Sequence, residues 1–102
     1  MPAETPVRFH PDAEDEVHVT ADWYDEHTAR GDDFLAAIDD TVEDIANAPW
    51  RWPLVAGVSP PTRRRLMKRN YQYSVFYRID DEGVLIVSVA HQSREHLYWL
   101  GR

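Results

Sequence analysis

The sequence predicts an α+β domain in which a helical hairpin packs on a small antiparallel sheet. Its expected element order is β-α-α-β-β-β, followed by a short C-terminal tail or helix. Two observations predict this class: apolar residues recur at helical spacing in the N-terminal half, and they alternate as in strands in the C-terminal half. The 102 residues leave room for one domain, 1–102, with one core.

The first two elements are a strand over residues 7–10 and a helix from Pro11 to about Arg30. Alternating apolar residues predict the strand. Pro11 suits the first turn of a helix because its missing N–H costs nothing there. Apolar residues continue at helical spacing as far as Tyr24, and Gly31 provides a stop for this helix.

A second helix follows at once and ends at Pro49. Its apolar residues, Leu35, Ile38, Val42 and Ile45, form one stripe, and the acids between them face water. Because the connection is so short, we expect the two helices to pack as an antiparallel hairpin.

An irregular connection, residues 50–62, contains three prolines, and we expect Trp50 and Trp52 to cap the core there. The segment 80–83 predicts a hairpin turn in which Gly83 takes a positive φ. Three strands are expected in this half of the chain: 63–69, 71–79 and 84–91.

Alternation assigns the side chains of the two longest strands to faces. The middle strand carries one row of Tyr73, Val75, Tyr77 and Ile79 and an opposite row of Ser74, Phe76 and Arg78. The last strand carries a row of Leu85, Val87 and Val89 that His91 continues. Since an antiparallel sheet can leave one face open, we expect a functional groove on that face, bordered by the basic strand.

Composition excludes several classes. The chain has no cysteine, so disulfides and thiolate metal sites are ruled out. The longest apolar run, 84–90, is far shorter than the roughly 20 residues that span a bilayer, and the N-terminus lacks signal-peptide character. The histidines are scattered, and His91 and His96 are five apart, which suits neither a helix face nor a strand face. We therefore expect a cytoplasmic protein without metal, cofactor or membrane contact.

Charge is divided unevenly along the chain. Residues 1–50 hold fourteen acids and two arginines, whereas residues 51–102 hold nine basic residues and four acids, within a net charge of -7. Seven basic residues and no acid occur between Arg51 and Ile79. This asymmetry predicts an acidic face and an anion-binding face, with the basic strand separated from the acidic helices by the length of the domain.

One cluster could converge at one end of the sheet and perform chemistry. Phosphodiester cleavage by 2′-hydroxyl attack needs a base, an acid and cations on the phosphate, and His, Tyr, Lys and Arg supply these without a metal. The same cluster would equally bind an acidic partner, and spacing alone does not separate the two. Its members are Arg65, Lys68, Arg78, His91, Arg94 and Tyr98.

The segments "RRRLMKRNYQYSVFYRI", "DDEGVLIVSVAHQSRE" and "YW" resemble the C-terminal half of the RelE/ParE toxin superfamily. The segments "FHPDAEDEV", "ADWYDE", "FLAAIDDTVEDIANAP" and "RWP" resemble its helical hairpin. This resemblance implies the toxin of a type II toxin–antitoxin pair. Its partner would be a small antitoxin whose flexible C-terminal part folds around the toxin, in a toxin homodimer or a heterotetramer with the antitoxin.

The superfamily has two functional branches. RelE-like members cleave mRNA on the ribosome with basic and tyrosine residues, and ParE-like members lack much of that set and poison DNA gyrase. Docking on the ribosome should favour a strongly basic molecule, so the acidic helical half disfavours the RNase branch. The tail "AHQSREHLYW" also resembles the ParE and plasmid-stabilisation branch more closely.

The first hypothesis is therefore a non-enzymatic gyrase inhibitor neutralised by an antitoxin. The alternatives are a ribosome-dependent endoribonuclease that uses the six residues above, and a weakly toxic or inactive co-repressor of the antitoxin. The resemblance implies a groove for target or antitoxin formed by Arg63, Arg64, Arg65, Lys68, Arg69, Arg78, Arg94 and Trp99.

Overall fold

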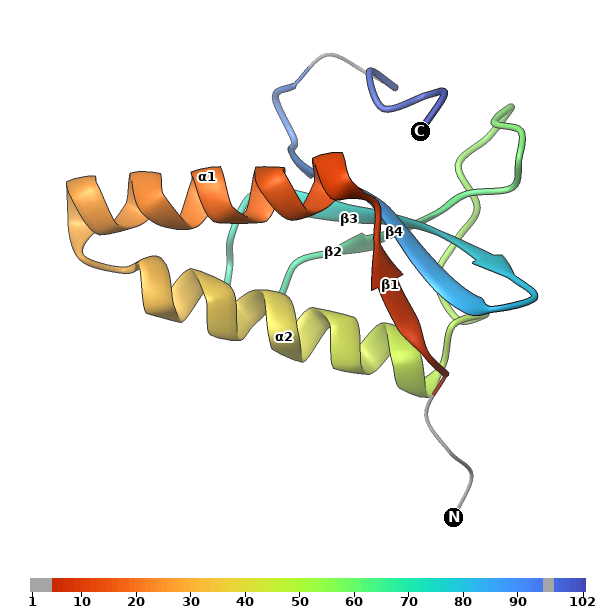
Figure 1. Ribbon diagram of the computed structural model, residues 1–102, viewed down its shortest axis with the longest axis horizontal. Helices are drawn as coiled ribbons and strands as arrows, with labels where there is room; N and C mark the ends of the chain where they lie inside the picture. Colours follow the sequence, from red (N-terminus) through yellow and green to blue (C-terminus); the bar gives the residue numbers. More distant parts are fainter. Residues whose placement is uncertain (1–4, 95–96) are drawn as a thin grey trace.

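The computed structural model describes residues 5–94 and 97–102 and confirms the predicted class and element order (Figure 1). Two helices lie side by side and antiparallel, joined by a short turn, and pack on one face of a four-stranded sheet. The elements are β1 (Val7–Phe9), α1 (Pro11–Thr28), α2 (Gly31–Asn47), β2 (Arg63–Leu66), β3 (Tyr73–Asp80) and β4 (Gly83–His91). No helix in the described ranges is long and apolar enough to cross a bilayer.

The sheet is mixed, with the strand order β1-β4-β3-β2. Strands β2, β3 and β4 are antiparallel neighbours, as the sequence predicts. Strand β1 departs from the expected antiparallel sheet because it pairs parallel with β4, from Val7 opposite Val84 to Phe9 opposite Ile86. The end of α2 lies beside the start of β1, and the connection over residues 48–62 then carries the chain to the far edge at β2, so that β1 is left beside the last strand.

The turn between the helices corrects the role predicted for Gly31. Helix α1 ends at Ala29, which takes a left-handed conformation with φ 55°. Gly31 instead begins α2, and its N–H donates to the Asp25 carboxylate at 2.8 Å. A Cβ on Gly31 would lie 2.7 Å from the Ala21 carbonyl oxygen, so glycine allows the two helices to approach closely.

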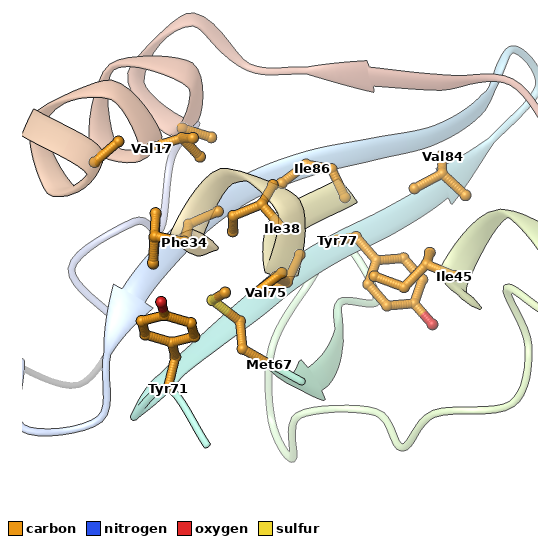
Figure 2. Packing of buried hydrophobic residues seen from close by; sticks show 14 residues of the cluster. Val17, Phe34, Ile38, Ile45, Met67, Tyr71, Val75, Tyr77, Val84 and Ile86 are labelled. Carbon is orange, nitrogen blue, oxygen red and sulfur yellow. The ribbon is translucent and has the colours of Figure 1, made fainter. Parts of the chain in front are cut away.

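Helix α2 supplies much of the core. Phe34, Ile38 and Ile45 are buried, and Figure 2 shows their side chains directed toward the sheet. Leu35 and Val42, predicted in the same stripe, are half-buried and pack against this core. Burying a large apolar side chain contributes roughly 1.5–3 kcal/mol, so this stripe fixes the hairpin on the sheet.

A β-bulge corrects the predicted face pattern of β4. Phe76 pairs with Ser88, but Tyr77 pairs with Ile86, so Val87 is an extra residue in β4. The β4 residues in the core are consequently Val84, Ile86 and Val89, and the expected row of Leu85, Val87 and Val89 is wrong. The predicted row of β3 is confirmed, since Val75 and Tyr77 lie in the core and Tyr73 and Ile79 pack against it.

The two tryptophans of the connection after α2 have different environments. Trp52 packs against the core as predicted, whereas Trp50 is 70% exposed and does not cap it. The basic strand is shorter than predicted and ends at Leu66, and Arg69 and Asn70 then take positive φ angles in the turn to β3. In the described part of the C-terminal segment, residues 97–102 form turns.

The C-terminal segment is attached to the domain by Glu16 of α1. This carboxylate accepts hydrogen bonds from Ser88 Oγ at 3.0 Å and from the Val89 N–H at 3.1 Å. It also accepts from the Tyr98 hydroxyl and from Arg102 Nη1 at 2.9 Å. One side chain therefore joins α1, β4 and the end of the chain.

Gly31→Ala should destabilise the protein, although a glycine-to-alanine change inside a helix usually stabilises by about 0.5–1 kcal/mol. The new methyl group would overlap the Ala21 carbonyl oxygen and the Asp25 carboxyl carbon, which lies 2.4 Å from the Cβ position. We expect a loss of about 1–3 kcal/mol in urea unfolding. Asp39→Ala, at an exposed position of the same helix, is the control, and a stabilising Gly31→Ala would contradict the argument.

Glu16→Gln should reduce the free energy of unfolding by about 1–3 kcal/mol, because it removes the charged acceptor of four donors. Urea unfolding at neutral pH measures the loss. Glu14→Gln on the same helix, whose side chain is 63% exposed, should change stability by less than about 0.5 kcal/mol. Equal stability of the two variants would show that Glu16 does not hold the segment.

Candidate functional site

The face of the sheet opposite the helices carries a groove of about 600 Å³. Its floor is formed by Ser74 and Phe76 of β3 and Ala90 of β4. One wall is the connection over residues 52–56, and the other is the C-terminal segment over residues 97–99. The predicted groove on the open face is therefore present, and small side chains in the floor give it depth.

Packing against the sheet positions the C-terminal wall. The buried ring of Trp99 lies on Phe76 with 4.7 Å between ring centroids. Leu97 takes a positive φ of 60°, and the hydroxyl group of Tyr98 is directed to Glu16. The segment thus covers one part of the open face and leaves the groove beside it.

The predicted site residues fall into three places in the structure. Arg64, Arg65, His91, Arg94, Tyr98 and Trp99 line the groove. Arg63 and Arg78 line a second hollow at the β3–β4 hairpin end of the sheet. Lys68 and Arg69 are directed to the carboxylates of α2.

The basic strand is not separated from the acidic helices, contrary to the sequence-based expectation. Arg65 and Lys68 both lie 3.3 Å from the Asp44 carboxylate. Arg69 contacts Asp33 at 3.0 Å and Asp40 at 2.8 Å. The sequence pattern could not show this, because the acids lie about 20 to 40 residues away and meet the strand only when α2 packs beside β2.

The ion pairs around Asp44 alter its titration. Partial burial would raise the pKa of the Asp44 carboxyl, but hydrogen bonds from Lys68 and Arg65 outweigh burial and hold the pKa below its usual value. Asp44 is therefore charged at neutral pH, and it neutralises part of the positive charge that the sequence places at the groove.

Arg64 and Arg94 are the exposed cations of the groove. Arg64 Nε donates to Ser74 Oγ at 3.2 Å, which fixes the guanidinium above the floor. The Arg94 guanidinium lies 4.2 Å from the centroid of the Tyr98 ring. These two residues place positive charge on both sides of an apolar floor, an arrangement suited to an amphipathic acidic segment.

Protein contacts occupy His91 Nδ1 and the Tyr98 hydroxyl, two groups that could serve acid–base chemistry. His91 Nδ1 accepts the Ser93 N–H at 3.0 Å, so the proton of the neutral ring lies on Nε2. Burial raises the pKa of Tyr98, and its hydrogen bond to Glu16 raises it further. A phenolate at Tyr98 is thus disfavoured, and Arg78 lies outside the groove.

The site residues predicted from the sequence do not include Glu16, Asp44, Trp52 or Arg102, which also shape the site. The two acids resemble every other acid of the helices in sequence, so their pattern carried no signal. Trp52 was assigned to the core, and it also lines the groove. In the part of the chain that the structure describes, no group of three histidines or acids could hold a metal ion, and His96 lies outside it.

Acid should remove the contribution of Asp44 to stability. Its pKa is depressed in the folded state, so this contribution is present above the ordinary value of 3.8 and is lost as the pH falls through the folded pKa. Asp44→Asn should therefore cost about 0.5–1 kcal/mol at pH 7. The difference in unfolding free energy between Asp44→Asn and the wild type, measured in urea, should shrink toward pH 3. Asp39→Asn is the control. A gap that does not depend on pH would refute the ion-pair argument.

Comparison with known proteins agrees with the fold and with the predicted superfamily. The model of the family "ParE toxin of type II toxin-antitoxin system, parDE" matches residues 7–96. A solved structure described as "Chromosomal ParDE TA system from P. aeruginosa" is similar, with a TM-score of 0.73 and 12% identity, covering 86% of this chain and 96% of that one. Curated proteins give no match.

At this identity the solved structure supports the fold, whereas the family match extends over most of the chain. It includes the helical hairpin, the basic strand and the β3–β4 hairpin. The chain therefore belongs to the ParE toxin family of type II toxin–antitoxin systems.

Proposed function

We propose that this protein is a cytoplasmic, non-enzymatic toxin that inhibits DNA gyrase and that a cognate antitoxin neutralises. Family membership supports the toxin role. The observation that carries the choice of mechanism is the state of four of the six residues that RNA cleavage would use. Arg65 and Lys68 share Asp44, Tyr98 is bonded to Glu16, and Arg78 lies in another hollow.

The charge distribution supports the same choice. A toxin that works on the ribosome enters a dense field of phosphates, where several unpaired cations favour binding. Here the segment 63–69 has five cations and directs three of them, Arg65, Lys68 and Arg69, to the carboxylates of α2. The groove keeps Arg64 and Arg94 around an apolar floor, which is better suited to a protein surface than to a nucleic-acid backbone.

The same groove offers a binding site for the antitoxin. An amphipathic segment could place its apolar side on Phe76 and Leu66 and its acids toward Arg64 and Arg94. Leu66 is 45% exposed at the edge strand β2, so the segment would cover apolar surface that now faces water. Bound antitoxin would then exclude gyrase by occupying the surface that the toxin needs.

Purified protein should inhibit gyrase supercoiling or stabilise cleaved gyrase–DNA complexes. The double variant Arg64→Ala, Arg94→Ala should lose about tenfold or more in potency, because two partly exposed charged contacts are removed. Arg30→Ala, at the turn between the helices and 60% exposed, should leave the potency unchanged. Circular dichroism should show that all three proteins are folded.

The alternatives predict different results in parallel assays. An endoribonuclease would produce codon-positioned mRNA cuts that disappear in His91→Ala, and that result would replace the gyrase proposal. The grouping of His91 with Arg94 in one groove is the feature that makes this assay necessary. A co-repressor would leave gyrase, mRNA and growth unaffected when it is induced without the antitoxin.

A further inference from the structure

A second hollow, of about 500 Å³, lies on the open face at the β3–β4 hairpin end of the sheet. Trp50 and Leu54 of the connection after α2 form one side, and Arg78 and Leu85 of the two long strands form the floor. Leu54 lies between this hollow and the groove described above. The proposed function does not use this hollow.

Its apolar side is exposed and held in position. Trp50 is 70% exposed and Leu54 is 55% exposed. Arg63 Nη1 donates to the carbonyl oxygens of Trp50 at 3.1 Å and Trp52 at 2.6 Å, and its guanidinium lies 5.3 Å from the centroid of the Trp50 ring. Since the tryptophan is already ordered, a ligand would lose less entropy on binding it.

The lining holds two arginines, of which Arg63 donates to backbone carbonyl oxygens and Arg78 has no counter-ion within the described ranges. Arg78 is half-buried, forms no ion pair there, and its Nε is buried without a hydrogen-bond partner. The nearby acid in the lining, Asp80, accepts two 2.7 Å hydrogen bonds from Arg8 and is neutralised by it. A ligand carboxylate in the hollow would therefore pair with the Arg78 guanidinium without competing with an existing ion pair.

We propose that this hollow binds a peptide segment of a partner protein that presents a carboxylate to Arg78 and a bulky apolar side chain to Trp50 and Leu54. Tryptophan and arginine are the residues that most often carry the binding energy of protein interfaces. A nucleic acid fits less well, because its backbone requires a row of cations. This lining combines Arg78 with an aspartate and with Arg63, whose guanidinium is already engaged by two backbone carbonyl oxygens.

The test uses the ¹⁵N-labelled full chain and two capped dipeptides, N-acetyl-Leu-Glu-amide and N-acetyl-Leu-Gln-amide. The glutamate peptide should shift the Trp50 indole N–H and the Arg78 Nε–H resonances during titration. The glutamine peptide should bind about fivefold or more weakly, because it cannot form the charge-assisted pair with Arg78.

Three variants test whether the peptides bind specifically in this hollow or nonspecifically elsewhere on the surface. Arg78→Gln should abolish the preference for glutamate, Trp50→Ala should weaken both peptides, and Arg30→Gln should change neither. The proposal is overturned if both peptides bind equally to the wild type or if neither shifts these two resonances. A single-stranded oligothymidylate that shifts them at lower concentration than the glutamate peptide would also overturn it, in favour of a nucleic-acid site.

Discussion

The shape of the open face depends on the hydrogen bonds that the Glu16 carboxylate accepts. Strand β1 pairs with β4 only as far as Ile86, so the edge of β4 beyond this point has unpaired backbone groups. The Glu16 carboxylate accepts a hydrogen bond from the Val89 N–H, and Arg102 donates one to the carbonyl oxygen of Val87 at 3.0 Å. The same carboxylate then holds the C-terminal segment that forms one wall of the groove. An acid on the helical side of the molecule thus determines the geometry of the other side.

A second constraint is the contact between α2 and the basic strand. The chain carries a large excess of acid, and part of it serves to position the basic residues around β2. Tyr71 belongs to the same contact, since its hydroxyl donates a hydrogen bond to Asp33 at 2.5 Å. Burial is the larger cause and this hydrogen bond the second cause that raise the pKa of Tyr71 to about 12. Most of the basic residues in this region therefore form ion pairs with α2. The arginines directed to the open face are the ones that can bind a partner.

Much of the fold could be predicted from local patterns, and much of the site could not. Helical spacing and alternation gave the element order, because each element is amphipathic in its own sequence. The β-bulge was missed because it depends on the pairing of Tyr77 with Ile86, and Gly31 was misjudged because the close contact involves Ala21 of the preceding helix. The residue types predicted a groove with a basic border. The partners of Arg65 and Tyr98 could not be predicted, because they are acids of α2 and α1 that lie far away in the sequence.

The bulge at Val87 has a further consequence for how such a groove can arise. Without the extra residue, the alternation of β4 would direct Val89 to the open face and Ser88 and Ala90 into the core. The bulge reverses this phase, so that Val89 fills the interior and Ala90 forms part of the floor of the groove. A single-residue insertion or deletion in β4 would therefore change which side chains form the floor of the groove, while the sequence of its walls stays the same.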